Sequence, residues 1–98
     1  MITLNEWVWD PLKSARNLAK HGLPLAAGAL VLDSDPHAVS RPDIHPDGDR
    51  WQTIGSAGGI VVLLMVDTDP ADGNQDGRII SVRKANPRER KAYADGYF

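Results

Sequence analysis

Residues 50–68 read RWQTIGSAGGIVVLLMVDT and predict two β-strands joined by a tight turn. The apolar run over residues 60–68 is typical of a central strand that is covered on both faces. Residues 50–56 have the composition of a strand that pairs with it. Gly58 and Gly59 suit a two-residue turn between the two strands, so the strands should run antiparallel.

Three further strands are expected around this hairpin. Residues 1–9 alternate with the period of a strand, and residues 78–85 predict a strand on which Arg83 has a fixed direction. Pro42 restricts the segment 38–44 to the edge of the sheet, because proline cannot donate a hydrogen bond to a neighbouring strand. Consecutive strands with short connections predict an antiparallel sheet.

Two helices are expected between the first strand and the edge strand. Asp10 is a good N-cap and Pro11 a good first helical residue, so a helix should begin there. Gly22 is a typical C-cap, which places the end of that helix. Residues 23–32 predict a second short helix that is apolar nearly all round and should be covered on more than one side.

A last helix is expected near the C-terminal end of the sequence. Asn86 is its N-cap, Pro87 its first residue, and Glu89 stands where a capping box needs a carboxylate. The helix should run to about residue 95. The resulting fold class is α+β, with an antiparallel sheet, two N-terminal helices and one C-terminal helix, and with the helices packed to one side.

The composition is that of a small globular protein. The chain has 98 residues, 24% of them charged, and no cysteine. One domain over residues 1–98 is therefore expected. The absence of cysteine excludes disulfide scaffolds, cysteine-ligated zinc and thiol catalysis. The apolar stretches are too short to cross a bilayer, and the N-terminal region lacks the basic residues of a signal peptide, so we expect a cytoplasmic protein.

The net charge of −2 conceals an asymmetry. Residues 33–76 hold nine Asp and two Arg, whereas residues 78–91 hold six basic residues and Glu89 as the one acid. A basic C-terminal segment of this kind can meet phosphates or an acidic partner. A solvated surface is the ordinary alternative.

Metal and nucleotide motifs are weak in this sequence. Residues 72–77 match D-x-N-x-D-G of a calcium loop, but the twelfth position, which should be a bidentate Glu, is Arg83. An ordinary loop is the better interpretation. Five potential ligands lack the spacing that would fix them, so we expect neither a metal nor a cofactor. They are His37, Asp43, His45, Asp47 and Asp49.

The basic strand and the helix after it form the most informative feature. Arg83 lies on the strand, and Arg88, Glu89 and Tyr93 follow on the helix. Together with Lys20 and His21 at the end of the first helix, they offer cations, a carboxylate, an imidazole and an aromatic ring. RNA cleavage through the 2′-hydroxyl needs a proton acceptor and fixed positive charge on the developing phosphorane. Structural roles are the alternative for each: Glu89 as a cap, Tyr93 as a packing residue, Arg83 as a partner of an Asp.

Five blocks of residues, in this order and spacing, resemble the BrnT toxins of bacterial type II toxin–antitoxin systems, and the resemblance covers nearly the whole chain. The blocks are Trp7-Val8-Trp9-Asp10-Pro11, Asn17-Leu18-Ala19-Lys20-His21-Gly22, Arg50-Trp51-Gln52-Thr53-Ile54-Gly55, Arg78-Ile79-Ile80-Ser81-Val82-Arg83-Lys84-Ala85 and Arg88-Glu89-Arg90-Lys91-Ala92-Tyr93. The wholly apolar segment 23–27 departs from the family, whose second helix usually starts with Ser or Thr followed by acidic residues.

The resemblance implies a RelE-like fold and a metal-independent endoribonuclease that cleaves RNA and blocks translation. It also implies a BrnA-like antitoxin with a ribbon-helix-helix domain, a tight toxin–antitoxin complex, and contact with operator DNA through that antitoxin. The site residues carried over are catalytic Lys20, His21, Arg83, Glu89 and Tyr93, and RNA-binding Arg50, Lys84 and Arg88.

Two questions stay open at the level of the sequence. A non-catalytic module that only forms the antitoxin complex is the alternative to an RNA-cleaving toxin. Within the catalytic interpretation, His21 is expected as an acid or electrostatic group and Glu89 as the base, although a helix N-terminus stabilises a carboxylate and weakens it as a base.

Overall fold

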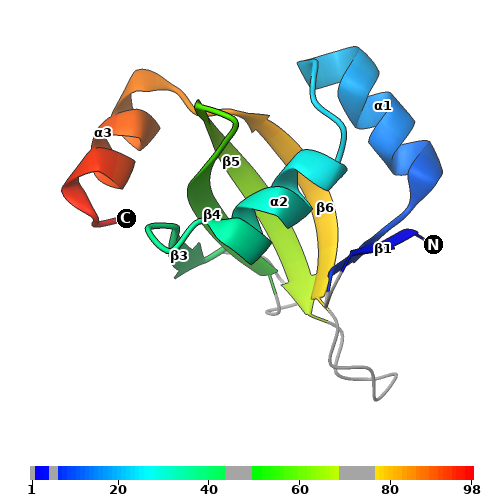
Figure 1. Cartoon of the computed structure of the whole chain (residues 1–98), viewed down its shortest axis with the longest axis horizontal. Helices are drawn as coiled ribbons and strands as arrows, with labels where there is room; N and C mark the ends of the chain where they lie inside the picture. Colours follow the sequence, from blue (N-terminus) through cyan, green and yellow to red (C-terminus); the bar gives the residue numbers. More distant parts are fainter. Residues whose placement is uncertain (1, 5–6, 44–49, 69–76) are drawn as a thin grey trace.

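The computed structural model of the chain describes residues 2–4, 7–43, 50–68 and 77–98 (Figure 1). The α+β class expected from the sequence is confirmed. In chain order the elements are β1 (Ile2–Leu4), β2 (Trp7–Trp9), α1 (Pro11–His21), α2 (Ala26–Ser34), β3 (Val39–Pro42), β4 (Arg50–Ala57), β5 (Ile60–Thr68), β6 (Gly77–Lys84) and α3 (Pro87–Asp95).

The strands form one sheet in the order β1-β2-β6-β5-β4-β3. β5 lies between β6 and β4 and pairs antiparallel with both, as the sequence predicts. β3 lies at the edge beside β4, in agreement with the position of Pro42. The pairing of β5 with its two neighbours and the edge position of β3 are therefore as the sequence predicts.

The expectation of a purely antiparallel sheet is wrong at its other edge, because β2 pairs parallel with β6. Parallel neighbours need a long crossover connection, and here the chain passes through α1, α2 and β3 to β5 before β6 begins. The predicted strand over residues 1–9 is also two strands, since β1 and β2 pair antiparallel with Ile2 opposite Trp9. The sheet is thus mixed.

The turn between β4 and β5 forms as predicted. Gly58 and Gly59 have φ of +57° and +82°, and Ala57 pairs with Ile60 directly across the turn. Two successive residues with positive φ are what a type I′ turn requires, and glycine adopts this conformation without steric cost. The turn fixes the register of the central hairpin.

α2 covers one face of the sheet, in front of β5 and β6 in Figure 1. Gly28 makes the approach close: a Cβ atom there would lie 2.9 Å from Val82 Cγ2 and 3.3 Å from Ile79 Cγ2. Ile79 and Val82 are three residues apart yet meet the same helix, because the β5–β6 register shifts between Met65 and Val66. Ile80 has no partner in this register, so the alternation of faces along β6 shifts by one residue at the bulge.

α2 begins and ends later than the predicted segment 23–32. Two side chains of α1 explain the late start, because Asn17 Nδ2 donates to the carbonyl of Leu23 at 2.7 Å and Ser14 Oγ accepts from the N–H of Leu25 at 2.9 Å. These bonds hold the backbone before the helix in a turn. Leu25 is fully buried at this point.

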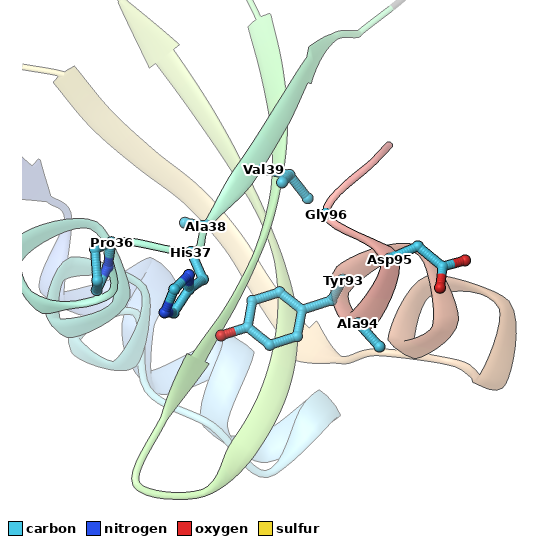
Figure 2. Close-up of a pocket in the computed structure, with 8 residues that line it drawn as sticks. All are labelled: Pro36, His37, Ala38, Val39, Tyr93, Ala94, Asp95 and Gly96. Atoms are coloured by element: carbon cyan, nitrogen blue, oxygen red, sulfur yellow. The ribbon is translucent and has the colours of Figure 1, made fainter.

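α3 lies on the opposite side of β4 from α2 (Figure 2), so the expectation that all helices pack to one side is wrong. Val82 faces α2, and the next residue, Arg83, therefore faces the other way. Arg83 pairs in register with Leu63, and Leu63 with Ile54, so the three share this second face. Ile54 is fully buried there, and α3 packs on β4.

Asn17 fixes α1 to the edge of β6. Its Nδ2 donates to the carbonyl of Val82 at 2.7 Å, and its Oδ1 accepts the N–H of Val82 at 3.2 Å. Among the described residues, β2 pairs with β6 at Gly77 and Arg78 but not at Val82, where the amide side chain of Asn17 takes the place of a neighbouring strand. Asn17 is 7% exposed, and its bonds close the edge of the sheet.

Asn17→Ala is expected to lower the free energy of unfolding by roughly 1–3 kcal/mol, because backbone groups of Val82 and Leu23 lose buried partners. Chemical denaturation followed by circular dichroism measures the change. Lys13→Ala, at an exposed position of the same helix, is the control and should stay within about 0.5 kcal/mol of the parent. Equal stability of Asn17→Ala and the control would contradict the anchoring role.

Candidate active site

β6 and α3 bring Arg83 and Glu89 into direct contact. Arg83 Nη1 lies 2.8 Å from Glu89 Oε1, and Nη2 lies 2.9 Å from Oε2, which makes a bidentate pair. The Arg83 side chain is 41% exposed, whereas that of Glu89 is 12% exposed. The carboxylate of Glu89 therefore holds the guanidinium in place, while part of the guanidinium stays open to solvent.

The start of α3 explains why Glu89 stands there. Asn86 Oδ1 accepts the N–H of Glu89 at 2.8 Å, and Glu89 Oε1 accepts the N–H of Asn86 at 2.9 Å. This is the capping box that the sequence predicts, and it is confirmed. One carboxylate thus caps the helix and orients the guanidinium of Arg83.

The contacts of Glu89 also set its acidity. Burial raises the pKa of Glu89, but hydrogen bonds from Arg83 and the Asn86 N–H, with the charges of Arg83 and Arg41, outweigh it and lower the pKa below its usual value. At neutral pH this carboxylate is ionised and is a weak proton acceptor. Its geometry suits holding Arg83 in place better than removing a proton.

Tyr93, one turn further along α3, is bound to Asp35. Its hydroxyl donates to Asp35 Oδ2 at 2.7 Å. This hydrogen bond, burial and the charge of Asp35 raise the pKa of Tyr93. The hydroxyl therefore keeps its proton and donates a hydrogen bond to Asp35. The ring of Tyr93 lines a pocket of about 490 Å³ beside His37 (Figure 2).

Asp35 was not identified from the sequence, although three elements meet at it. It follows α2 directly, and it accepts the N–H of Ser56 at 2.8 Å and that of His37 at 2.9 Å besides the Tyr93 hydroxyl. Ser56 lies on β4 beyond the pairing with β3, so the carboxylate binds an N–H at an open strand edge. The hydrogen bond from the N–H of His37 to Asp35 forms an Asx turn. The preference of Asp for such turns is the one sequence signal that could have pointed to Asp35.

The pKa of Asp35 is lowered. Burial raises the pKa, but the hydrogen bonds from Ser56, Tyr93 and His37 and the charge of His37 together outweigh it. A carboxylate whose pKa is lower in the folded state than in the unfolded chain stabilises the fold above the unfolded value of about 3.9. That contribution is lost as the pH falls through the lower, folded pKa.

Lys20 and His21 lie in the last turn of α1. In Figure 1, α1 and α3 lie at opposite ends of the molecule. Within the part of the chain that the structure describes, no hydrogen bond or ion pair joins Lys20 or His21 to α3. The structure thus does not bring His21 and Glu89 into contact, and the roles predicted for Lys20 and His21 remain untested.

The residues predicted to bind RNA do not form one cluster with the Arg83–Glu89 pair. Lys84 follows Arg83 at the end of β6, and Arg88 lies exposed in the first turn of α3. Arg50 begins β4 on the face that carries Ile54, four residues or about 13 Å from it along the strand. Arg50 is therefore separated from the Arg83–Glu89 pair by the length of half the strand.

Of the five potential metal ligands in the sequence, the structure describes His37 and Asp43. His45, Asp47 and Asp49 lie outside the described residues, and so does most of the loop with the D-x-N-x-D-G motif. Among the residues that the structure describes, no group of three or more His, Cys, Asp or Glu side chains is arranged to hold a metal ion. In the same segments, no helix is long and apolar enough to span a bilayer.

A family model described as "Ribonuclease toxin, BrnT, of type II toxin-antitoxin system" matches residues 9–89. The chain belongs to this family. A comparison with curated proteins gave no match. Membership makes the chain a type II ribonuclease toxin with an antitoxin as its partner. The matched segment includes Arg83 and Glu89, whereas Tyr93 lies beyond it.

Asp35→Asn is expected to lower the melting temperature at neutral pH, because three hydrogen bonds lose their charged acceptor, at a cost of roughly 1–3 kcal/mol. The parent should lose this advantage as the pH falls below about 4, so the two melting curves should converge in acid. Scanning calorimetry from pH 7 to pH 2 measures both effects. Asp95→Asn is the control, since that carboxylate is 56% exposed and, among the described residues, binds Lys91 alone. A difference between parent and variant that does not shrink in acid would contradict the charge-based account.

Proposed function

We propose that this toxin is a metal-independent endoribonuclease that cleaves RNA and so inhibits translation. The observation that carries the proposal is the bidentate Arg83–Glu89 pair at the junction of β6 and α3. It fixes a partly exposed guanidinium beside further cations. Family membership supports the ribonuclease activity, and the geometry supports this place for it.

The proposed reaction is attack by the 2′-oxygen of a ribose on the adjacent phosphorus. The bond from O2′ to phosphorus forms and the bond from phosphorus to O5′ breaks, which gives a 2′,3′-cyclic phosphate and a 5′-hydroxyl. The 2′-proton goes to a base, and the leaving 5′-oxygen takes up a proton. Negative charge grows on the nonbridging oxygens, and Arg83 is placed to stabilise it.

The remaining residues have proposed roles around Arg83. Lys84, Arg88 and Arg50 bind the RNA backbone, and Lys20 and His21 supply charge or a proton from the end of α1. Tyr93 holds α3 through Asp35. Glu89, whose pKa is lowered by its partners, orients Arg83 in this scheme and is not the base.

The partner is proposed to be a BrnA-like antitoxin with a ribbon-helix-helix domain, through which the complex reaches operator DNA. Apolar side chains on the described surface support a protein partner. Leu30 of α2 is 51% exposed, while Leu25 just before the helix is fully buried. Leu30 is therefore the proposed contact on α2 for the antitoxin that family membership implies.

Arg83→Ala is expected to abolish growth arrest on induced expression and to slow RNA cleavage about 10²- to 10³-fold, the usual effect of removing a transition-state donor. Cleavage of a labelled RNA by the purified toxin measures the rate. Arg16→Ala removes an exposed arginine from α1 and is the control. A folded Arg83→Ala variant with the parental rate would contradict the catalytic role, and a parent that cleaves no RNA would favour the non-catalytic module.

Leu30→Ser is expected to keep the melting temperature within a few degrees and to weaken antitoxin binding about tenfold, as loss of a buried anchor does. The free toxin should also self-associate less. Calorimetric titration and size-exclusion chromatography measure the two effects. Leu12→Ser, at an exposed position in the first turn of α1, is the control. Unchanged antitoxin affinity would show that the partner leaves α2 uncovered.

A further inference from the structure

A second pocket, of about 390 Å³, lies between β3, α3 with its N-cap, and the residues that follow α3. Its walls include Arg41 from β3, Arg88 and Glu89 from α3, and the rings of Tyr97 and Phe98. Glu89 also binds Arg83, so this pocket is one side chain away from the proposed phosphate site. Arg41, Tyr97 and Phe98 were not among the residues that the sequence pointed to.

The pocket carries positive charge. The acidic side chain of its lining, Glu89, is already bound by both Nη atoms of Arg83. Among the described residues, the side chain of Arg88 forms no hydrogen bond or ion pair, and that of Arg41 forms no ion pair. An anion that enters the pocket would therefore meet two guanidinium groups, of which Arg41 also acts on Glu89 through its charge without forming an ion pair with it.

Arg41 is held in a fixed orientation. Its Nε donates to Gln52 Oε1 at 3.0 Å, and Gln52 Nε2 in turn donates to Asp43 Oδ1 at 2.6 Å. The guanidinium carbon lies 3.9 Å from the centre of the Phe98 ring. Stacking and one hydrogen bond leave the Nη groups without a partner among the described residues, so they can make a bidentate contact with a phosphate.

Tyr97 supplies a free aromatic face. The residue is 80% exposed, and within the described chain its side chain has no hydrogen bond or ring contact. Two cations, one of them oriented, and an exposed ring on one pocket match the two chemical parts of a nucleotide, the phosphate and the base. A phosphate alone would leave most of the volume empty.

We propose that this pocket binds one nucleotide of a single-stranded RNA next to the cleaved bond. The base stacks on Tyr97, and its phosphate is bound by Arg41 and Arg88. The pocket thus positions the RNA so that the scissile phosphate reaches Arg83, and the inference rests on the proposed function for that last step. Binding itself does not require cleavage.

The test is the affinity for a short 2′-O-methyl RNA, which cannot be cleaved because its 2′-oxygens are blocked. Fluorescence anisotropy of the labelled oligonucleotide measures binding to the whole toxin. Tyr97→Ala is expected to weaken binding about tenfold, as loss of one base–aromatic stack does, while Tyr97→Phe keeps the affinity. Arg41→Ala and Arg88→Ala should each reduce the slope of log Kd against the logarithm of the salt concentration by about 0.7, the value for one lost phosphate contact.

Lys91→Ala is the control for net charge, because Lys91 is an exposed cation of α3 that pairs with Asp95 away from this pocket. It should leave the affinity within about twofold. Melting temperatures of all variants confirm that they fold, which the exposure of Tyr97 favours.

Unchanged affinity of Tyr97→Ala for the inert RNA would overturn the proposal. So would a Tyr97→Ala variant that binds RNA normally but antitoxin weakly, since the pocket would then take a protein segment. A parent that binds the inert RNA through Tyr97 yet cleaves no unmodified RNA would support the pocket and contradict the proposed function. The two failures are therefore distinguishable.

Discussion

Glu89 binds both Nη atoms of Arg83 and the backbone N–H of Asn86, and the arrangement of the site follows from this shared carboxylate. The capping bonds fix where α3 begins, and the bidentate pair fixes the helix to the end of β6. Because the same contacts lower the pKa of Glu89, the carboxylate stays charged and keeps Arg83 oriented. A guanidinium that is oriented before substrate arrives suits the stabilisation of a phosphorane.

Asp35 provides the second attachment of α3, at its other end. The carboxylate joins the end of α2, the open edge of β4 and the hydroxyl of Tyr93. α2 and α3 lie on opposite sides of β4, so this contact links the two helical layers past the strand edge (Figure 2). Two attachments limit the movement of α3 relative to β6, and hence that of both pockets along it.

The sequence predicted the parts of the fold that depend on neighbouring residues. The Gly58–Gly59 turn, the Asp10 and Asn86 caps and the Pro42 edge strand all follow local rules, and all are present. The parallel pairing of β2 with β6 and the late start of α2 depend on contacts between distant segments, such as that of Asn17 with Val82. No local pattern predicts these.

The candidate site shows the same division. Arg83, Glu89 and Arg88 are close in sequence, and the structure brings the first two together. Asp35 and Arg41 are far from α3 in sequence and come close to it only when the sheet forms. Their charges could be read from the sequence, but their partners could not. Lys20 and His21 were grouped with α3 by chemistry alone, and the structure leaves them on α1.

A double-mutant cycle on RNA cleavage tests the central claim, that Glu89 acts through Arg83. Arg83→Ala, Glu89→Gln and the double variant are compared with the parent by single-turnover rates, and the amide in Glu89→Gln retains a capping acceptor. The account predicts that Glu89→Gln slows the parent but adds no further loss to Arg83→Ala. An additional loss of about 10²- to 10⁴-fold in the Arg83→Ala background would show that Glu89 is an independent base and would contradict the account.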